Sequence, residues 1–318
     1  MNAKLSLIDT HCDTAFELFS RGEGIYTNSC HVNLDAAQCY ENYAQFFAVW
    51  ADKRRSDDQC FEDFLKISDN LRSEVDSYSD KIALVRTFSE MESAFECGKR
   101  AAFLAVEDAR ILAGKLDRLD ELWRRGVKYL TLLWGGDTCI GASHDREGGL
   151  TDFGRAVVMR CFELGIIPDV SHASERVTDE VCELALEYNK PFIASHSNSY
   201  EQFAHSRNLR ARHLDTLMRL GGTVGLNLCP YHIKNVSSGD ECTLDDVLLH
   251  IEKYMELGAT DALCLGCDLD GTDLPRGFSD VGDIRRIADG LARIGYYDAL
   301  IEKIFYKNQY EFIKRNFI

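Results

Sequence analysis

Short apolar runs rich in β-branched and aromatic residues alternate with longer segments of helical periodicity along most of the chain. Eight of these runs fit β-strands, at 5–13, 45–51, 101–107, 127–134, 166–172, 191–197, 222–229 and 261–268. Such alternation is typical of a parallel sheet whose strands are joined by crossover helices. Eight strands predict an α/β fold of the closed (β/α)8, or TIM barrel, type. A further run at 81–87 either replaces one strand or lies outside the barrel.

Helical segments lie between several of these runs, for example at 150–165, 174–189 and 243–258. Each begins near a Ser or Thr with an acidic residue in its first turn, and the first and third end at a glycine. These are the ordinary signals of helix ends. The 318 residues include only four prolines and no linker-like tract or internal repeat. We therefore expect a single domain over residues 1–318.

The charge and cysteine content limit the partners and the compartment. The chain has 52 acidic residues against 36 lysines and arginines, a net charge of −16. This excess of negative charge disfavours binding to nucleic acid and to anionic membranes. No apolar stretch has the length of a membrane span, and the start of the chain lacks the pattern of a signal peptide. The twelve cysteines have no paired spacing, which favours buried thiols in a reducing compartment, so we predict a cytoplasmic protein.

Side chains that bind metals stand at the predicted carboxyl ends of five strands. They are His11, Asp13, Glu107, His172, His196 and Asp268. In a barrel of this type the carboxyl ends of the strands form the face that holds the active site. Imidazole nitrogens together with carboxylate oxygens are a donor set typical of zinc, and a carboxylate can bridge two metals. Two such metals lower the pKa of a shared water and deliver hydroxide to a carbonyl carbon.

Eight short motifs occur in one order between residues 9 and 271. They are DTHCD at 9–13, FLAVED at 103–108, YLTL at 129–132, GLTDFGRAVV at 149–158, DVSHAS at 169–174, SHSNSY at 195–200, SRN at 206–208 and GCDLDG at 266–271. In these motifs and their order the chain resembles the membrane or renal dipeptidase family of binuclear zinc peptidases, peptidase family M19. The resemblance implies a non-secreted, microbial-type enzyme with a metal-dependent hydrolase barrel that cleaves dipeptides. It adds that D-residues are often accepted at the second position.

The resemblance also implies which residues bind the two zinc ions. One ion would be held by His11, Asp13 and Asp268, and the other by His172 and His196. Glu107 would bridge the two ions. Asp9 shares a strand face with His11 and Asp13, because side chains alternate along a strand, and we expect it to orient one of the ligands.

Other residues match the family positions that handle the substrate. Arg207 corresponds to the arginine that binds the substrate near its carboxylate, a task that suits the planar donor fork of arginine, and Asn208 follows it. Asp268 is also the candidate to carry a proton between the attacking water and the leaving amine, beside Glu107 as the other catalytic residue.

One position departs from the family pattern. Mammalian members carry a histidine where this chain has Trp134, and that histidine resembles a group that stabilises the substrate carbonyl oxygen. The indole N–H of Trp134 can donate one hydrogen bond, or the ring can simply line the pocket. His144 in the neighbouring loop is an alternative donor. The catalytic rate and the substrate preference are therefore the expectations that the resemblance supports least.

Three functions remain open at this point. The leading one is a zinc-dependent dipeptidase in which a hydroxide that bridges two metals attacks the peptide bond. The same barrel acting on another small amide, ester or lactone is an alternative, because one site design serves many carbonyl compounds. A metal-binding barrel without catalysis is the third. Members of the family often form dimers, so a homodimer is also left open.

Overall fold

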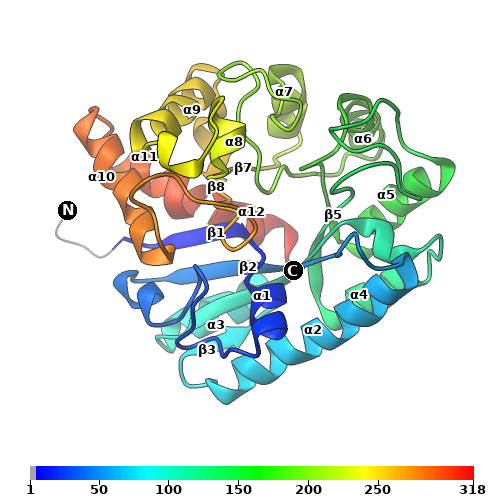
Figure 1. Ribbon diagram of the computed structural model, residues 1–318, viewed down its shortest axis with the longest axis horizontal. Coiled ribbons are helices and arrows are strands. Elements are labelled where there is room, and N and C mark those ends of the chain that lie inside the picture. The colour runs from blue at the N-terminus through cyan, green and yellow to red at the C-terminus, as the bar shows by residue number, and fades with distance from the viewer. Residues whose placement is uncertain (1–4) are drawn as a thin grey trace.

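The computed structural model describes residues 5–318 and contains a ring of parallel strands surrounded by helices (Figure 1). Within this range the strands are β1 (Leu7–Cys12), β2 (Tyr43–Trp50), β3 (Ile82–Leu84), β4 (Arg100–Glu107), β5 (Val127–Thr131), β6 (Ile167–Asp169), β7 (Val224–Leu226) and β8 (Leu263–Leu265). Seven of them follow one another in the order β6-β5-β4-β2-β1-β8-β7, and neighbours are parallel. The predicted α/β barrel class is confirmed.

The segment predicted as a strand at 191–197 lies between β6 and β7. It forms only single bridges, Asp169 with Ile193 on one side and Ala194 with Val224 on the other. These bridges complete the ring, so the eight predicted runs all lie in it. The extra run at 81–87 contains β3, which pairs only with the start of β4 and therefore lies outside the ring.

Helices follow most strands and cover the outside of the ring. They are α1 (Thr14–Arg21), α2 (Asp57–Ser77), α3 (Phe88–Glu96), α4 (Arg118–Arg125), α5 (Asp152–Leu164), α6 (Glu175–Tyr188), α7 (Ala211–Arg219), α8 (Pro230–Ile233), α9 (Leu244–Glu256), α10 (Arg285–Arg293), α11 (Asp298–Glu302) and α12 (Asn308–Asn316). The three helices expected from sequence correspond to α5, α6 and α9. The side chains of Thr151 and Ser174 cap α5 and α6, and α5 ends at Gly165 in the left-handed conformation.

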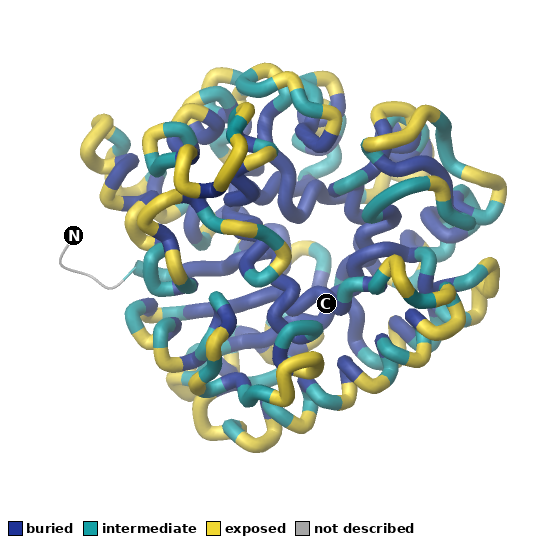
Figure 2. The backbone as a smooth tube through the Cα atoms, viewed as in Figure 1, coloured by how far each residue is buried: buried dark blue, intermediate teal, exposed yellow. Residues whose placement is uncertain are grey.

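The amino end of the ring is closed by an aromatic plug, which we define as Phe46, Phe103, Phe312 and Phe317. The rings of Phe46 and Phe103 are stacked with their centres 4.6 Å apart, and Phe317 from the end of the chain contacts both. All four side chains are buried. Figure 2 shows that the strands inside the ring are buried and that the exposed positions lie on the outer helices and loops.

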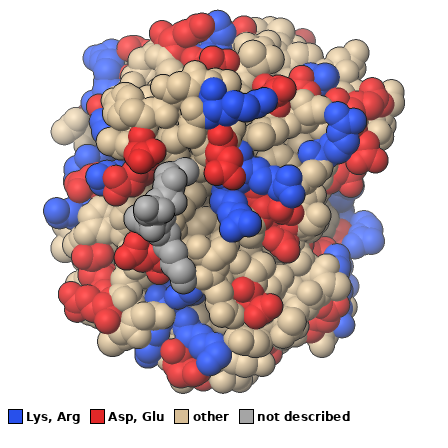
Figure 3. Space-filling view, turned by 90° about the vertical axis from the view of Figure 1, so that its left-hand side faces the viewer, with Lys and Arg blue, Asp and Glu red and all other residues tan. Residues whose placement is uncertain are grey.

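The outer surface carries both signs of charge. Acidic and basic side chains are intermixed on the face shown in Figure 3. In the part of the chain that the structure describes, no helix combines the length and the apolar character that a bilayer crossing requires.

Candidate metal centre

All six predicted metal ligands meet at the carboxyl end of the ring. Their donor atoms form three overlapping groups, each within 4.8 Å, and these groups are His11–His196–Asp268, Glu107–His172–His196 and His11–Asp13–Glu107. Five of these residues are buried, and the side chain of His172 is 10% exposed. Their positions at the ends of β1, β4 and β6, within the segment 191–197 and just beyond β8 bring donors that are far apart in sequence to one place.

Glu107 lies at the centre of this cluster. Its Oε1 atom is 3.1 Å from Nε2 of His172, 3.3 Å from Nε2 of His196 and 3.8 Å from Nε2 of His11. On the far side, Nε2 of His11 is 3.8 Å from one oxygen each of Asp13 and Asp268. Glu107 thus belongs to two of the three groups, one with His11 and Asp13 and one with His172 and His196.

The backbone is adapted to bring these donors together. His172 and Asp268 have positive φ angles of 67° and 59°, a left-handed conformation that costs an L-residue about 1–2 kcal/mol. Gly271 lies against the carboxylates of Asp13 and Asp268, and a Cβ atom at that position would overlap both. The absence of a side chain at Gly271 therefore allows these two carboxylates to approach the same point.

The ring of His11 is oriented by Tyr129. The hydroxyl of Tyr129 donates to the carbonyl of Thr10 at 2.8 Å, so it accepts a hydrogen bond from Nδ1–H of His11, also at 2.8 Å. This places the proton on Nδ1 and leaves the lone pair of Nε2 directed at the carboxylates. Nε2 of His11 is buried and has no hydrogen-bond partner among residues 5–318.

The ring of His196 is oriented in the same way by a different pair of residues. Nδ1 of His196 is 2.7 Å from Oγ of Ser195, which donates to the carboxylate of Asp169 at 2.6 Å. His196 therefore carries its proton on Nδ1 and presents Nε2 to Glu107. Sequence reasoning did not single out Tyr129, Asp169 or Ser195. All three lie in the quoted motifs, and Asp169 and Ser195 share theirs with the predicted ligands His172 and His196, which is the signal that was available.

Burial and mutual repulsion shift the protonation of the cluster. Burial, with the charges of Asp13 and Asp268 added, raises the pKa of Glu107 well above its usual value. Burial also raises the pKa of Asp268, and it lowers the pKa values of His172 and His196. Without a cation the three carboxylates therefore destabilise one another.

The donor set and its unpaired atoms fit bound metal ions. Nε2 of His11 and Oδ1 of Asp13 are buried without a hydrogen-bond partner in the described part of the chain. Leaving such atoms unpaired costs free energy, and a divalent cation would satisfy them and offset the carboxylate charges. These residues can therefore hold metal ions.

A cavity of about 470 Å³ opens above the cluster. Asp13, Glu107, His172 and Asp268 line it, and so do Trp134, Lys53, His144 and His232. The centres of the Trp134 and His172 rings are 6.1 Å apart, and those of His144 and His172 are 5.8 Å apart. Both side chains that sequence suggested as hydrogen-bond donors thus lie at this cavity. His232, to which the sequence reasoning assigned no role, lies there as well.

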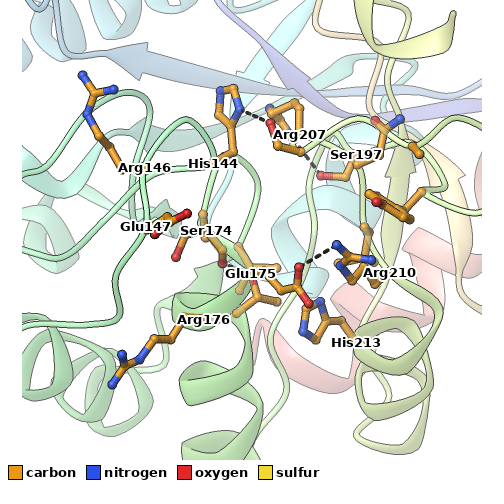
Figure 4. Close-up of a pocket in the computed structure, with 18 of the residues that line it drawn as sticks. His144, Arg146, Glu147, Ser174, Glu175, Arg176, Ser197, Arg207, Arg210 and His213 are labelled. Carbon is orange, nitrogen blue, oxygen red and sulfur yellow. Dashed lines mark hydrogen bonds and ion pairs between the residues drawn. The ribbon is translucent and has the colours of Figure 1, made fainter.

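Arg207 lies beside this cavity, on the wall of a second one of about 460 Å³ (Figure 4). His144 and Arg146 line both cavities. The Arg207 side chain is 3% exposed and donates to Oγ of Ser197 and to the carbonyl of His196, each at 2.9 Å. Among residues 5–318 its Nε has no hydrogen-bond partner and no carboxylate lies within 4.0 Å of its guanidinium. Arg207 is therefore a buried cation without a counter-ion.

Asn208 and Asp9 contact the backbone instead of the cluster. The amide nitrogen of Asn208 donates to the carbonyls of Phe203 and His232, at 2.9 and 2.8 Å. Oδ1 of Asp9 accepts from the backbone N–H groups of His11 and Cys267, at 3.2 and 3.0 Å. Asp9 thus joins β1 to the segment after β8, while the ring of His11 is held by Tyr129.

Comparisons with known proteins agree with this geometry. The model of the membrane dipeptidase family, peptidase family M19, matches residues 1–315. An uncharacterized dipeptidase of Schizosaccharomyces pombe is 30% identical over 239 residues, which cover 73% of this chain and 56% of that protein. The chain therefore spans little more than half the length of this relative.

Three solved structures share the fold. Dipeptidase AC, a metallopeptidase of family M19, has a TM-score of 0.91 at 24% identity, with 99% of each chain covered. A metallopeptidase from Rhodobacter sphaeroides, bound to a phosphinate mimic of the dipeptide L-Ala-D-Ala, has a TM-score of 0.90 at 23% identity over 99% of this chain and 100% of that one. The probable dipeptidase PvdM from Pseudomonas aeruginosa has a TM-score of 0.87 at 18% identity over 98% and 95%.

Proposed function

The chain belongs to the membrane dipeptidase family, peptidase family M19, and from this premise we propose that it is a zinc-dependent dipeptidase. The observation that carries the proposal is the meeting of Glu107 with five other donor side chains at the wall of a cavity. A cavity of about 470 Å³ is of the size that small-molecule sites have. The substrate would be a dipeptide, and a D-residue at its second position is part of the proposal.

We assign the six donors to two metal ions. His11, Asp13 and Asp268 would hold one and His172 and His196 the other, and Glu107, whose Oε1 lies within 3.8 Å of all three histidines, would bridge the ions. Two divalent cations bound here would polarise the substrate carbonyl and make a water molecule acidic enough to attack it. Tyr129 and Ser195 keep the histidine rings in the required tautomer.

We assign the substrate carboxylate to Arg207. A buried guanidinium without a counter-ion is costly, and an incoming carboxylate would offset that cost with charge-assisted hydrogen bonds. Asn208 contributes by holding the loop that carries His232. This requirement for a negative charge favours dipeptides over simple esters and lactones, which lack a carboxylate.

We assign proton transfer to Asp268. One of its oxygens accepts a hydrogen bond from the side chain of Asn227 at 3.0 Å, which fixes the carboxylate within the cavity. From there it would take a proton from the attacking water and return it to the leaving amine. His144 or Trp134 would donate a hydrogen bond to the carbonyl oxygen. Burial lowers the pKa of His144 to about 4, so His144 would act as a neutral donor at neutral pH.

We further propose the cytoplasm as the location of the protein. All twelve cysteines lie among the described residues as unpaired thiols, which is usual for proteins of a reducing compartment. The single domain over residues 1–318 and the homodimer stay predictions.

Hydrolysis of L-Ala-D-Ala and L-Ala-L-Ala by the purified protein tests the proposal. We expect cleavage that a chelator abolishes and zinc restores, with no restoration in Glu107→Gln. Glu96→Gln, at an exposed glutamate at the end of α3, serves as the matched control and should behave as the wild type. Amidation of the substrate carboxylate should remove most of the rate. A zinc-loaded protein that cleaves neither dipeptide would refute the proposal, and equal rates on the amides would favour the broader amidohydrolase alternative.

A further inference from the structure

Lys53 lies on the wall of the metal cavity, just after the end of β2. Its Nζ atom is 5.0 Å from the centre of the Trp134 ring, and both side chains line the same cavity as Glu107. A cation over the face of an indole is attracted by the negative charge of the ring face. No carboxylate lies within 4.0 Å of this ammonium in the described part of the chain. Lys53 therefore presents an unpaired positive charge to the cavity.

The indole beneath Lys53 is held in place by other rings. Trp134 packs edge-on against Trp50, with ring centres 5.2 Å apart, and Trp50 packs in the same way against Phe16, also at 5.2 Å. On its other side Trp134 lies against His172. Edge-to-face contacts of this kind fix the orientation of aromatic side chains. Lys53 itself is exposed, and the half-buried ring of Trp134 beneath it is held by these contacts.

The two cavities carry more unpaired positive charge than one dipeptide carboxylate needs. Lys53 and Arg207 line them, and neither lies within 4.0 Å of a carboxylate among residues 5–318, whereas Arg146 lies 3.6 Å from Asp145 and 4.0 Å from Asp137. Arg210, which lines the second cavity, is by contrast paired with Glu175 at 2.6 Å (Figure 4). Arg176, on the same cavity, is paired with Glu180 at 3.3 Å. In a chain with a net charge of −16, cations left without partners around a cavity indicate an anionic ligand.

Lys53 and Arg207 face the cluster from opposite sides. Around the ring, three strands separate β2 from the segment 191–197 in either direction, because the order is β2, β4, β5, β6, segment, β7, β8 and β1. Lys53 follows β2, and Arg207 is bound to the end of the segment. If the substrate carboxylate lies at Arg207 and the scissile carbonyl at the cluster, the N-terminal residue of the dipeptide extends towards Lys53.

We propose that the enzyme prefers dipeptides whose N-terminal residue is acidic, and that Lys53, supported by Trp134, binds the side-chain carboxylate of that residue. This inference rests on the proposed dipeptidase function and names its substrate class. The ion pair would form at the rim of the cavity and would act mainly on KM, because it lies away from the bond that is broken.

The test compares kcat/KM for L-Glu-L-Ala and L-Gln-L-Ala, which differ in charge and hardly in shape. We expect the wild type to favour the glutamyl substrate by about two- to fivefold, the range of an ion pair at an exposed site. Lys53→Gln should bring the ratio close to one, and Lys53→Glu should reverse it. Lys66→Gln, at an exposed lysine on α2 away from both cavities, is the matched control and should keep the wild-type ratio.

L-Ala-L-Ala is measured with every variant, so that loss of the preference is distinguished from loss of catalysis. Equal rates on the glutamyl and glutaminyl substrates, with normal cleavage of L-Ala-L-Ala, would overturn this inference and leave the dipeptidase intact. A preference for L-Ala-L-Glu over L-Ala-L-Gln that Lys53→Gln does not change would place the acidic residue at the other end, and would also overturn it. Absence of cleavage of all these dipeptides would refute the proposed function and the inference with it.

Discussion

The two ends of the barrel contrast in what their side chains contribute. At the amino end the aromatic plug is apolar, and the stacked rings of Phe46 and Phe103 exclude water. At the carboxyl end six polar side chains are also largely shielded from water, and two of them lie on left-handed backbone. Burial stabilises the first group and destabilises the second, because charged groups lose hydration that only a ligand restores. The plug and the surrounding core therefore stabilise the fold, whereas the buried charges at the carboxyl end lower its stability when no ligand is bound.

Replacing the carboxylate of Glu107 should give the largest difference between the effect on activity and the effect on stability. Glu107→Gln is expected to lower kcat by about 10³-fold or more, because the proposed bridging ligand is lost. In the metal-free protein the same change should raise the melting temperature or leave it unchanged, because it removes a buried charge from beside Asp13 and Asp268. Steady-state kinetics and thermal unfolding in a chelator measure both effects. A clear drop in the metal-free melting temperature would show that the contrast between the ends is wrong.

A change in the aromatic plug should have the opposite pattern. Phe103→Ala is expected to lower the free energy of unfolding by about 3–5 kcal/mol, the usual effect of removing a buried phenylalanine. The activity per folded molecule should stay near that of the wild type, since Phe103 lies at the other end of the ring. Denaturant unfolding together with active-site titration tests this. Loss of zinc binding in the folded fraction would mean that the two ends are coupled.

Tyr129 contacts both the aromatic plug and the cluster of metal-binding side chains. A substitution there tests whether the two ends act independently. The ring centre of Tyr129 is 5.6 Å from that of Phe46 in the plug, and its hydroxyl holds the ring of His11. Tyr129→Phe keeps the ring and removes the hydroxyl, so metal affinity should fall by about 10- to 100-fold with little change in packing. Competition with a chelator measures this affinity. Ser195→Ala should act in the same direction through His196, and unchanged affinity in both variants would contradict the orienting roles.

His250 tests whether buried polar groups outside the cluster are also sensitive to acid. It accepts a hydrogen bond from the N–H of Ser199 and donates to the carbonyl of Ile233, and burial lowers its pKa to about 4 although Asp246 acts in the other direction. Between pH 6.5 and 4 the unfolded chain therefore binds the additional proton, so this contribution to stability is complete above pH 6.5 and is lost as the pH falls. Urea unfolding at pH 7.5 and pH 5 should show a larger loss for the wild type than for His250→Gln. Equal losses would exclude His250 as a source of acid sensitivity.

His144 should give the smallest effect, and one confined to catalysis. If it donates to the carbonyl oxygen, His144→Ala should lower kcat about tenfold, the value of one hydrogen bond, while zinc content stays near that of the wild type. Kinetics and metal analysis of the same preparation measure the two quantities. An unchanged kcat would leave Trp134 as the donor.

The sequence by itself determined the features that depend on neighbouring residues. Strand alternation places His11 and Asp13 on one face, and the apolar runs end where Glu107, His172 and Asp268 begin the loops. Because these properties follow from local backbone geometry, the barrel class and the cluster of donors were predictable without coordinates.

The tertiary structure alone decided which groups from different strands contact one another. It closed the ring at 191–197 with single bridges instead of a regular strand, engaged the amide of Asn208 with two carbonyls, and placed Tyr129 against His11. It also placed Lys53 over the indole ring of Trp134, on the side of the barrel opposite Arg207. Such contacts join residues that are far apart in the chain, and they depend on how the closed barrel positions each strand. A local sequence pattern does not determine those positions.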